Sequence, residues 1–363
     1  MSFQSSIGAI TKKVPRKLGA LFFATALLTS TACKKSTPDW DTPASAATAS
    51  TSPPAAQQIE APTPVAQDEP KPANASPAPK EKSKPVNMPE SGLRFISYNV
   101  ENWLTMDRYV DRKQLKGAPK PDKEKEAVVR ILSRQNPDVI GICEIGTAAD
   151  LAELQEDLKA AGLNLPHSHY TGGADPTRHL GFLSRYPITS TAKPAETEYQ
   201  LAGQTYGINR GILDATIEAR GKSYRFLGVH LKSKRDSEQG DQEAIRLNEA
   251  RLLRRHVDSI LKTDANARLV VYGDFNDTRA TPAIKQITGK YNDPTYLTAI
   301  PAKDSNQEAW THYWELNDIY SRIDFIMVSK GLKEDVDFQA AKIINDSDWK
   351  EASDHRPLLA IFK

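Results

Sequence analysis

Polar residues that could bind a metal ion or transfer protons stand at the ends of apolar segments in this sequence. They are Asn99, Glu144, His230, Asp274, Asp324 and the pair Asp354-His355. A single carboxylate at a strand end is usually a turn residue, because a buried carboxylate without a partner is costly. Six such positions are hard to attribute to turns. Since strand ends meet at the rim of a sheet, we expect these side chains to gather in one site.

Together these residue types indicate a hard divalent cation beside general acid and base groups. Carboxylate and amide oxygens are the ligands that Mg²⁺ prefers, and imidazoles transfer protons near neutral pH. The chain has only two cysteines, Cys33 and Cys143, which disfavours a zinc–thiolate site. Because Cys143 lies in an apolar run, we interpret it as a small buried strand residue and not as a nucleophile.

The segments that must position these residues alternate between strands and helices. Alternating or continuous apolar patterns predict strands at 93–99, 138–144, 180–185, 211–218, 224–231, 268–272, 323–328 and 358–362. Helical spacing of apolar residues predicts helices over 123–135, 149–161 and 242–262. This order, with several strands in direct succession, predicts an α/β fold in which helices cover a sandwich of mixed sheets.

The ordered motifs around these residues resemble those of one superfamily. The motifs are Tyr98-Asn99-Val100-Glu101, Glu144, Gly228-Val229-His230, Gly273-Asp274-Phe275-Asn276-Asp277, Arg322-Ile323-Asp324 and Ser353-Asp354-His355. Their order is similar to that of the endonuclease/exonuclease/phosphatase superfamily of deoxyribonuclease-like metal-dependent phosphoesterases. The resemblance implies a four-layer α/β sandwich, with two mixed β-sheets flanked by helices and the site at one edge of the sheets.

The resemblance also implies a metal site. Glu144 would be the main Mg²⁺ ligand, with Asn99 and Asp354 close by. Glu101 occupies a position where some members carry a second acidic ligand. Mg²⁺ keeps several waters and takes one or two protein carboxylates, which leaves room for a phosphate oxygen. Mn²⁺ and Ca²⁺ stay as alternatives to Mg²⁺.

Catalytic roles follow from the same resemblance. Asp274 would orient or deprotonate the attacking water, and Asn276 would donate a hydrogen bond to a phosphoryl oxygen. His230 and His355 would contact the phosphate as donors. Asp324 would pair with His355 and fix its tautomer. The reaction would be in-line attack of water on phosphorus, without a covalent intermediate.

Three further basic residues are candidates for contact with the substrate. Arg185 lies in a segment that resembles a substrate-facing segment of the superfamily. Arg210 directly precedes a predicted strand, and Lys232 follows His230 in a basic loop. For each of the three, a structural or solvent-exposed role is the alternative.

The leading interpretation of the substrate is extracellular DNA or RNA. Superfamily branches that resemble deoxyribonuclease and sphingomyelinase carry His at the position of His230, whereas the apurinic/apyrimidinic branch tends to carry Tyr. Residues 93–363 hold 38 basic and 39 acidic side chains, a net charge of −1, which weakens the case for non-specific duplex binding without excluding it.

Other substrates and one non-enzymatic role stay as alternatives. A sphingomyelinase- or phospholipase C-like phosphodiesterase ranks second, because the sequence shows no exposed aromatic hairpin that would enter a bilayer. A phosphomonoesterase ranks third. A non-catalytic surface binding module is least favoured, since every expected motif position is filled. No protein partner is evident.

Residues 1–33 are typical of an export signal, with a basic segment at 12–17 and an apolar run at 18–28. Cys33 follows the small residues Ser30-Thr31-Ala32, which resembles the lipobox of bacterial lipoproteins and implies lipidation of Cys33 and a membrane anchor. Leu is usual where Ser30 stands. Ordinary cleavage to a secreted or periplasmic protein, and a retained apolar anchor, are therefore the alternatives.

The segment after the export signal is expected to be a disordered linker. Twelve of the 24 prolines lie between Pro38 and Pro89, and that stretch contains no glycine. Such a composition cannot bury enough apolar surface to fold. The sequence thus predicts a signal peptide over 1–33, a linker over 34–92 and a catalytic domain over 93–363.

Overall fold

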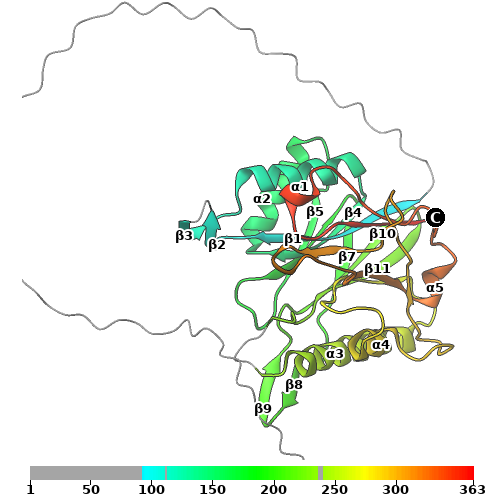
Figure 1. Cartoon of the computed structure of the whole chain (residues 1–363). Coiled ribbons are helices and arrows are strands. Elements are labelled where there is room, and N and C mark those ends of the chain that lie inside the picture. The colour runs from blue at the N-terminus through cyan, green and yellow to red at the C-terminus, as the bar shows by residue number, and fades with distance from the viewer. Residues whose placement is uncertain (1–91, 111–112, 236–239) are drawn as a thin grey trace, which may run out of the picture. The chain divides into compact units, whose positions relative to one another are not determined.

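The computed structural model describes residues 92–110, 113–235 and 240–363 (Figure 1). The predicted signal peptide, Cys33 and the linker up to residue 91 lie outside the described residues. No helix in the described ranges combines the length and the apolar character needed to cross a membrane.

The first of two six-stranded sheets has the order β17-β18-β1-β4-β6-β5. Its strands are β1 (Leu93–Trp103), β4 (Val139–Ile145), β5 (His167–Thr171), β6 (His179–Ser184), β17 (Lys342–Ile343) and β18 (Leu358–Phe362). β1 and β4 are parallel, whereas the other neighbours are antiparallel, so the sheet is mixed.

The second sheet has the order β13-β16-β12-β11-β10-β7. Its strands are β7 (Ile188–Thr191), β10 (Ile212–Ala219), β11 (Lys222–His230), β12 (Leu269–Asp274), β13 (Thr298–Ala299) and β16 (Asp324–Val328). β11 and β12 are its parallel pair, and the remaining neighbours are antiparallel. Both sheets therefore have the mixed character that the sequence predicts.

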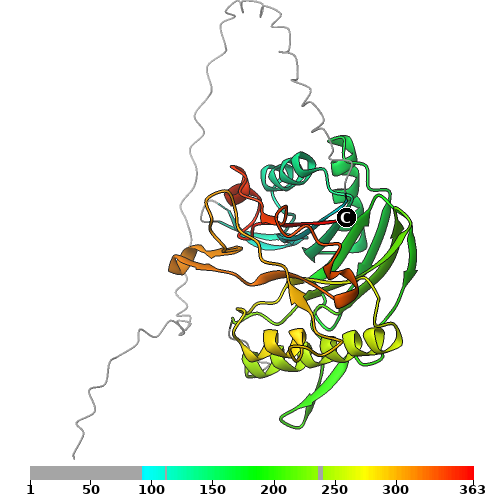
Figure 2. The same cartoon turned by 90° about the vertical axis from the view of Figure 1, so that its right-hand side faces the viewer.

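Helices cover the outer face of each sheet, as Figures 1 and 2 show. α1 (Asp122–Gln135) and α2 (Ala148–Ala160) pack on the first sheet, and α3 (Gln242–Thr263) and α4 (Pro282–Thr288) pack on the second. Two short helices, α5 (Lys330–Lys333) and α6 (Trp349–Ala352), lie before the last strands of the chain. Apolar side chains at helical spacing, such as Val128 and Leu132, form these buried helix faces.

The inner faces of the two sheets enclose the central core. Phe95 of the first sheet packs against Phe226 and Tyr272 of the second, with ring centroids 4.9 Å apart in both pairs. Replacing such a buried ring with alanine typically costs about 3–5 kcal/mol. The order of layers is helix, sheet, sheet, helix, which confirms the predicted four-layer α/β sandwich, and each predicted helix and strand has a counterpart.

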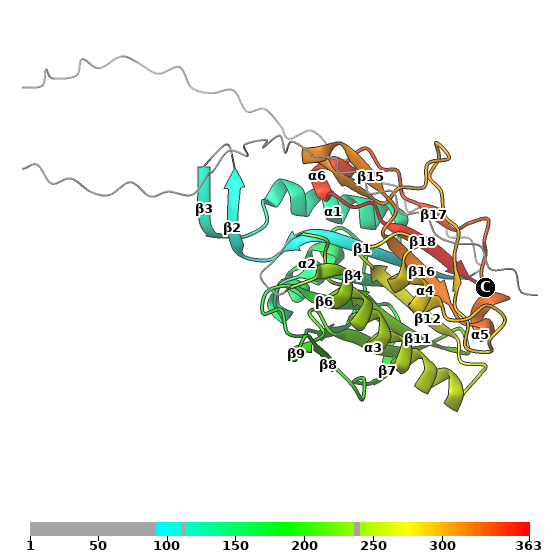
Figure 3. The same cartoon turned by 60° about the horizontal axis from the view of Figure 1, so that its bottom comes forward.

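Three two-stranded hairpins extend from this sandwich (Figure 3). They are β2 (Met106–Val110) with β3 (Lys113–Ala118), β8 (Glu198–Leu201) with β9 (Gln204–Gly207), and β14 (His312–Trp314) with β15 (Ile319–Ser321). A one-turn helix, η1 (Glu315–Asn317), connects β14 to β15. This last hairpin borders the site described next.

Candidate active site

Strand register brings the polar strand ends to one edge of the sandwich. In the parallel pair β1–β4, Asn99 lies opposite Cys143, which directly precedes Glu144. In the second sheet, His230 at the end of β11 lies opposite Asp274 at the end of β12, and Asp274 lies opposite Asp324 at the start of β16. Register therefore brings the predicted side chains together within each sheet.

Asn99 joins the two sheets at this edge. Its Nδ2 lies 3.3 Å from Glu144 Oε1, 3.2 Å from Asp274 Oδ2 and 3.4 Å from His355 Nε2. Its Oδ1 accepts a hydrogen bond from the backbone N–H of Glu101. Asn99 therefore links the acidic and histidine side chains of the two sheets, and its role as a metal ligand stays a prediction.

His355 and Asp324 form a hydrogen-bonded pair in the site. His355 Nδ1 lies 2.8 Å from Asp324 Oδ2, and both side chains are buried. Burial opposes a charged imidazole, but the carboxylates of Asp324 and Asp274 outweigh burial and raise the pKa of His355 well above its usual value. Asp324 thus holds Nδ1 and leaves Nε2 facing Asp274, at 3.7 Å.

Asp274 lies at the centre of the site. Its Oδ2 is 3.4 Å from His230 Nε2 and 3.3 Å from Asn276 Nδ2, and its Oδ1 accepts the backbone N–H of Asn276. Burial raises the pKa of Asp274 to about 7, with His355 acting against the shift and Asp324 adding to it. A carboxylate with this pKa suits proton transfer near neutral pH.

His230 has the opposite electrostatic setting. It is buried, and burial together with the positive charges of Arg210 and His355 holds the pKa of His230 well below its usual value. The ring is therefore neutral. Its Nε2 faces Asp274 and lies 3.8 Å from Glu144 Oε1, so it projects toward the same point as the acidic groups.

Backbone geometry fixes two of these residues. Glu144 has φ 66°, which side chains other than Gly seldom adopt, and its Oε2 accepts the backbone N–H of Asn102. Gly273 has φ 132°, and a Cβ there would lie 1.9 Å from the carbonyl oxygen of Val229. Only glycine therefore lets Asp274 lie beside His230.

Three carboxylates that line one cavity mark a place for a cation. Glu101 Oε2 accepts the backbone N–H of Asp354, and burial and the charge of Asp354 raise the pKa of Glu101 to about 7, against the effect of the buried Lys120. Asp354, Glu101 and Glu144 all line one cavity of about 380 Å³. These three carboxylates are partly buried and share the cavity, and a bound cation would stabilise them, so the residues present fit a divalent metal ion.

Histidines add to the donors around Asp354. His312 Nε2 lies 3.6 Å from Asp354 Oδ2, and potential ligand atoms of His312, Asp354 and His355 all lie within 4.8 Å of one another. A second such group consists of Asp274, Asp324 and His355. Because Asp324 already binds His355 Nδ1, the second group is better explained as catalytic than as metal-binding.

Four basic side chains line the same cavity: Arg178, Arg210, Lys234 and Arg235. Arg210 is 7% exposed, its Nε lies 3.3 Å from Asp175 Oδ2, and its Nη1 is buried with no hydrogen-bond partner among the described residues. Arg178 Nε donates to Asn102 Oδ1 at 2.8 Å and lies 4.0 Å from Glu144 Oε2. Acidic side chains, a neutral imidazole and cationic side chains therefore line the same cavity.

Two of the basic residues singled out in the sequence lie elsewhere. Arg185 follows β6 at the end away from Glu144, where its guanidinium donates to Asp138 and Asn136, so the structure does not bring it to the cavity. Lys232 is 9% exposed and is not among the residues that line the cavity. Its backbone binds α3, and Lys234 and Arg235 present the positive charge of that loop instead.

Among the cavity residues that escaped the sequence analysis are Arg178 and His312. Arg178 directly precedes β6, so the criterion of a polar residue at a strand end would have found it. His312 opens the short strand β14, for which the sequence gives no strand pattern of its own. Its bridge to His355 and its contact with Asp354 show that it belongs to the site.

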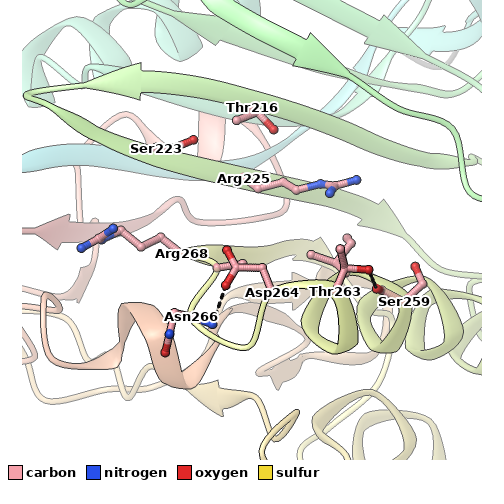
Figure 4. Close-up of a pocket in the computed structure, with 10 residues that line it drawn as sticks. Thr216, Ser223, Arg225, Ser259, Thr263, Asp264, Asn266 and Arg268 are labelled. Carbon is pink, nitrogen blue, oxygen red and sulfur yellow. Dashed lines mark hydrogen bonds between the residues drawn. The ribbon is translucent and has the colours of Figure 1, made fainter.

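A second cavity, of about 460 Å³, lies toward the other end of β11 and β12 (Figure 4). Its two arginines are both engaged. Arg225 donates two hydrogen bonds to the carboxylate of Asp214, and Arg268 donates to Asp335. The arginines of this cavity therefore belong to structural ion pairs. They differ in this from the candidate catalytic side chains at the sheet edge described above.

A four-layer α/β sandwich with acidic and histidine side chains at one sheet edge defines a class of phosphoesterases that usually depend on a metal ion. The sequence profile of the endonuclease/exonuclease/phosphatase family matches residues 95–348, more than half of the chain, and the chain belongs to this family. No curated protein matches it in sequence.

Several solved structures share the fold. An endonuclease/exonuclease/phosphatase family protein from Leptotrichia buccalis is 17% identical with a TM-score of 0.52, covering 75% of this chain and 99% of that one. Sphingomyelinase C from Streptomyces griseocarneus is 14% identical with a TM-score of 0.52, covering 75% and 99%. Beta toxin from Staphylococcus aureus with bound magnesium ions is 16% identical with a TM-score of 0.51, covering 75% and 100%.

Proposed function

We propose that this protein is a divalent-metal-dependent phosphodiesterase that hydrolyses nucleic acid. The observation that carries the proposal is the convergence of Asp274, His230 and the Asp324–His355 pair on the cavity that also holds the acidic cluster. Proton-transfer groups and an anion-stabilising environment at one point are what phosphoester hydrolysis needs.

The side chains divide the chemistry among them. Asp274 accepts a proton from the attacking water, with Asn276 holding its carboxylate in place. His355, kept charged by Asp324, donates to the phosphoryl oxygens as negative charge builds on them. Neutral His230, at the end of β11 beside Asp274, also contacts the phosphate. A divalent ion bound by Glu144, Glu101 and Asp354 would supply Lewis-acid stabilisation of that charge.

The positive side chains around the cavity favour nucleic acid as the substrate. Arg178, Arg210, Lys234 and Arg235 line the cavity and are suited to neutralising phosphates of a polyanion. These local basic side chains can bind phosphates although the net charge of the whole domain is close to zero. They support DNA or RNA more than a substrate with a single phosphate group.

A lipid phosphodiester is the second candidate, because the β14–β15 hairpin exposes apolar side chains. Leu316 is 85% exposed and Tyr320 49%, and Trp314 and Ile319 of the same hairpin line the cavity. The sequence-based expectation that no exposed aromatic hairpin is present was therefore wrong. A hairpin of this kind beside the site is suited to contact with a lipid surface.

The activity test uses the purified protein with bis-p-nitrophenyl phosphate, plasmid DNA and sphingomyelin vesicles, each with Mg²⁺ and with EDTA. We expect metal-dependent cleavage of the bis-ester and of plasmid DNA. Cleavage of the bis-ester and of vesicles, with intact plasmid, would favour the lipid substrate. An intact bis-ester with Mg²⁺, Mn²⁺ and Ca²⁺ would refute the proposal.

We also propose that the enzyme is exported and tethered to a membrane through Cys33. The support is the order of basic segment, apolar run, small residues and cysteine in residues 1–33. In a bacterial host, radiolabelled palmitate should label the wild-type protein, and Cys33→Ser should abolish the label and release the protein from the membrane fraction. A labelled Cys33→Ser variant would exclude this anchor.

A further inference from the structure

Asp324 and His355 come from different sheets, although their side chains are hydrogen-bonded. Asp324 is the first residue of β16 in the second sheet, and His355 lies just before β18 in the first. Facing sheets are held together by packed side chains and not by a ladder of backbone hydrogen bonds. A separate structure must therefore set the distance between the two residues at this edge.

Thr311 contacts the backbone of both segments, the one that holds Asp324 and the one that holds His355. It is fully buried, and its Oγ1 accepts hydrogen bonds from the backbone N–H groups of Ile323, at 3.2 Å, and Asp324, at 3.1 Å. Its carbonyl oxygen accepts the backbone N–H of Arg356, the neighbour of His355, at 2.7 Å. One residue outside both sheets thus binds the strand of Asp324 and the segment of His355.

The surroundings of Thr311 keep it in place. Its own N–H donates to the carbonyl oxygen of Ser321 on β15. The guanidinium of Arg356 lies 3.3 Å from the centroid of the Trp310 ring and donates to Asp304 Oδ2 at 2.7 Å. The next residue, His312, forms a bridge with His355. The base of the β14–β15 hairpin is therefore fixed to the catalytic segment on both sides of Thr311.

We propose that the Thr311 hydroxyl is a positioning group that sets the geometry of the Asp324–His355 pair; this role in turnover rests on the proposed function. The hydroxyl is the acceptor for two buried N–H groups at the start of β16. Valine has nearly the same shape but no acceptor, so Thr311→Val leaves both donors unsatisfied. The start of β16 then shifts to find other acceptors, and Asp324 moves relative to His355.

The test compares Thr311→Val with Thr311→Ser, which keeps the hydroxyl, in the full chain. Thr311→Val should lower kcat on bis-p-nitrophenyl phosphate by about 10- to 100-fold, the usual effect of misplacing a catalytic group by about 1 Å, with little change in KM. Thr311→Ser should restore kcat. In proton NMR, the downfield ring N–H signal of His355 should persist in wild type and Thr311→Ser and be lost in Thr311→Val.

Ser329→Ala is the matched control for stability. Ser329 is a fully buried residue just beyond the far end of β16, and its Oγ accepts the N–H of Leu269 and donates to the carbonyl oxygen of Ala267. Its loss should lower the melting temperature without changing kcat or the His355 signal. If Thr311→Val does not fold, Thr311→Cys, whose sulfur is a weak acceptor, replaces it.

Two results would overturn the inference: wild-type kcat with an unchanged His355 signal in Thr311→Val, or an equal loss of kcat in Ser329→Ala. If wild type cleaves no phosphodiester, the proposed function fails. The NMR comparison of Thr311→Val with Thr311→Ser still decides whether the hydroxyl sets the Asp324–His355 pair.

Discussion

The carboxylate of Glu249 on α3 lies 2.7 Å from the side-chain nitrogen of Asn209, and both residues are buried. The same carboxylate accepts the backbone N–H groups of Asn209 and Lys232. Asn209 precedes Arg210, and Lys232 follows His230 by two residues. α3 therefore holds the two loops that bring a cation and an imidazole to the site, although α3 itself supplies no side chain to the cavity lining.

Glu249→Gln should weaken both the fold and the activity. The amide nitrogen of glutamine would face backbone N–H groups, so at least one buried donor loses its acceptor and stability falls by about 1–3 kcal/mol. Urea unfolding and kcat on bis-p-nitrophenyl phosphate measure the two effects. Glu243→Gln, in the exposed first turn of α3, is the control and should change neither. Equal stability of the two variants would contradict the assigned role of Glu249.

Glu144→Ala should remove metal-dependent activity without unfolding the domain. Binding of Mg²⁺ to the native state raises the melting temperature of wild type, and this rise should be absent in the variant. EDTA should abolish wild-type turnover, and added Mg²⁺ should restore it. Glu156→Ala, at an exposed position of α2, should behave as wild type. A Mg²⁺-dependent rise in the Glu144→Ala variant would place the metal elsewhere.

His355→Ala should lower kcat by about 10²- to 10⁴-fold, as expected for loss of a positioned proton donor. Circular dichroism should show a folded domain. His167→Ala is a suitable control because His167 on β5 lies opposite Ser184, at the end of β6 away from Glu144. Wild-type turnover in His355→Ala would refute the assignment of catalytic groups.

The lowered pKa of Asp214 predicts that the folded domain loses stability in acid. Burial alone would raise the pKa of Asp214, but hydrogen bonds from His256 and Arg225 outweigh burial and lower it. A carboxyl group with a lowered folded-state pKa stabilises the fold above its unfolded value of about 3.9, and this stability is lost as pH falls through the folded-state pKa.

Asp214→Asn should therefore cost about 3 kcal/mol at pH 7, because it leaves His256 and Arg225 without their buried carboxylate partner. The difference from wild type should shrink at pH 3. Urea unfolding at the two pH values measures it. A difference of the same size at both would show that the charge of Asp214 does not contribute.

Lys234 and Arg235 are expected to contribute to the salt dependence of DNA binding. Replacing Lys234 and Arg235 together with glutamine should weaken binding to duplex DNA and reduce the slope of log K against log salt by about 1 for each removed phosphate contact. Fluorescence anisotropy at several salt concentrations gives the slope. An unchanged slope, with vesicle cleavage lost in a Leu316→Ser and Ile319→Ser double variant, would favour the lipid substrate instead.

The sequence by itself determined the order of the main strands and helices and the residues at the centre of the site. Apolar runs fix where strands lie, and a polar residue at the end of a buried run, such as Glu144 or Asp274, must face the sheet edge or bind a partner. Nothing more than local pattern and motif order is needed for this step. Glu101 and Asp354 followed from their motifs in the same way.

The tertiary structure decided which arginine beside β6 belongs to the site. Arg178 precedes β6 and Arg185 follows it, so the two are equivalent in local pattern. β6 runs antiparallel to β4, which places Arg178 near Glu144 and Arg185 near Asp138 at the other end. The direction of pairing is set by contacts between segments far apart in the chain. Local sequence carries no record of it, and the same is true of the bridge that brings His312 to His355.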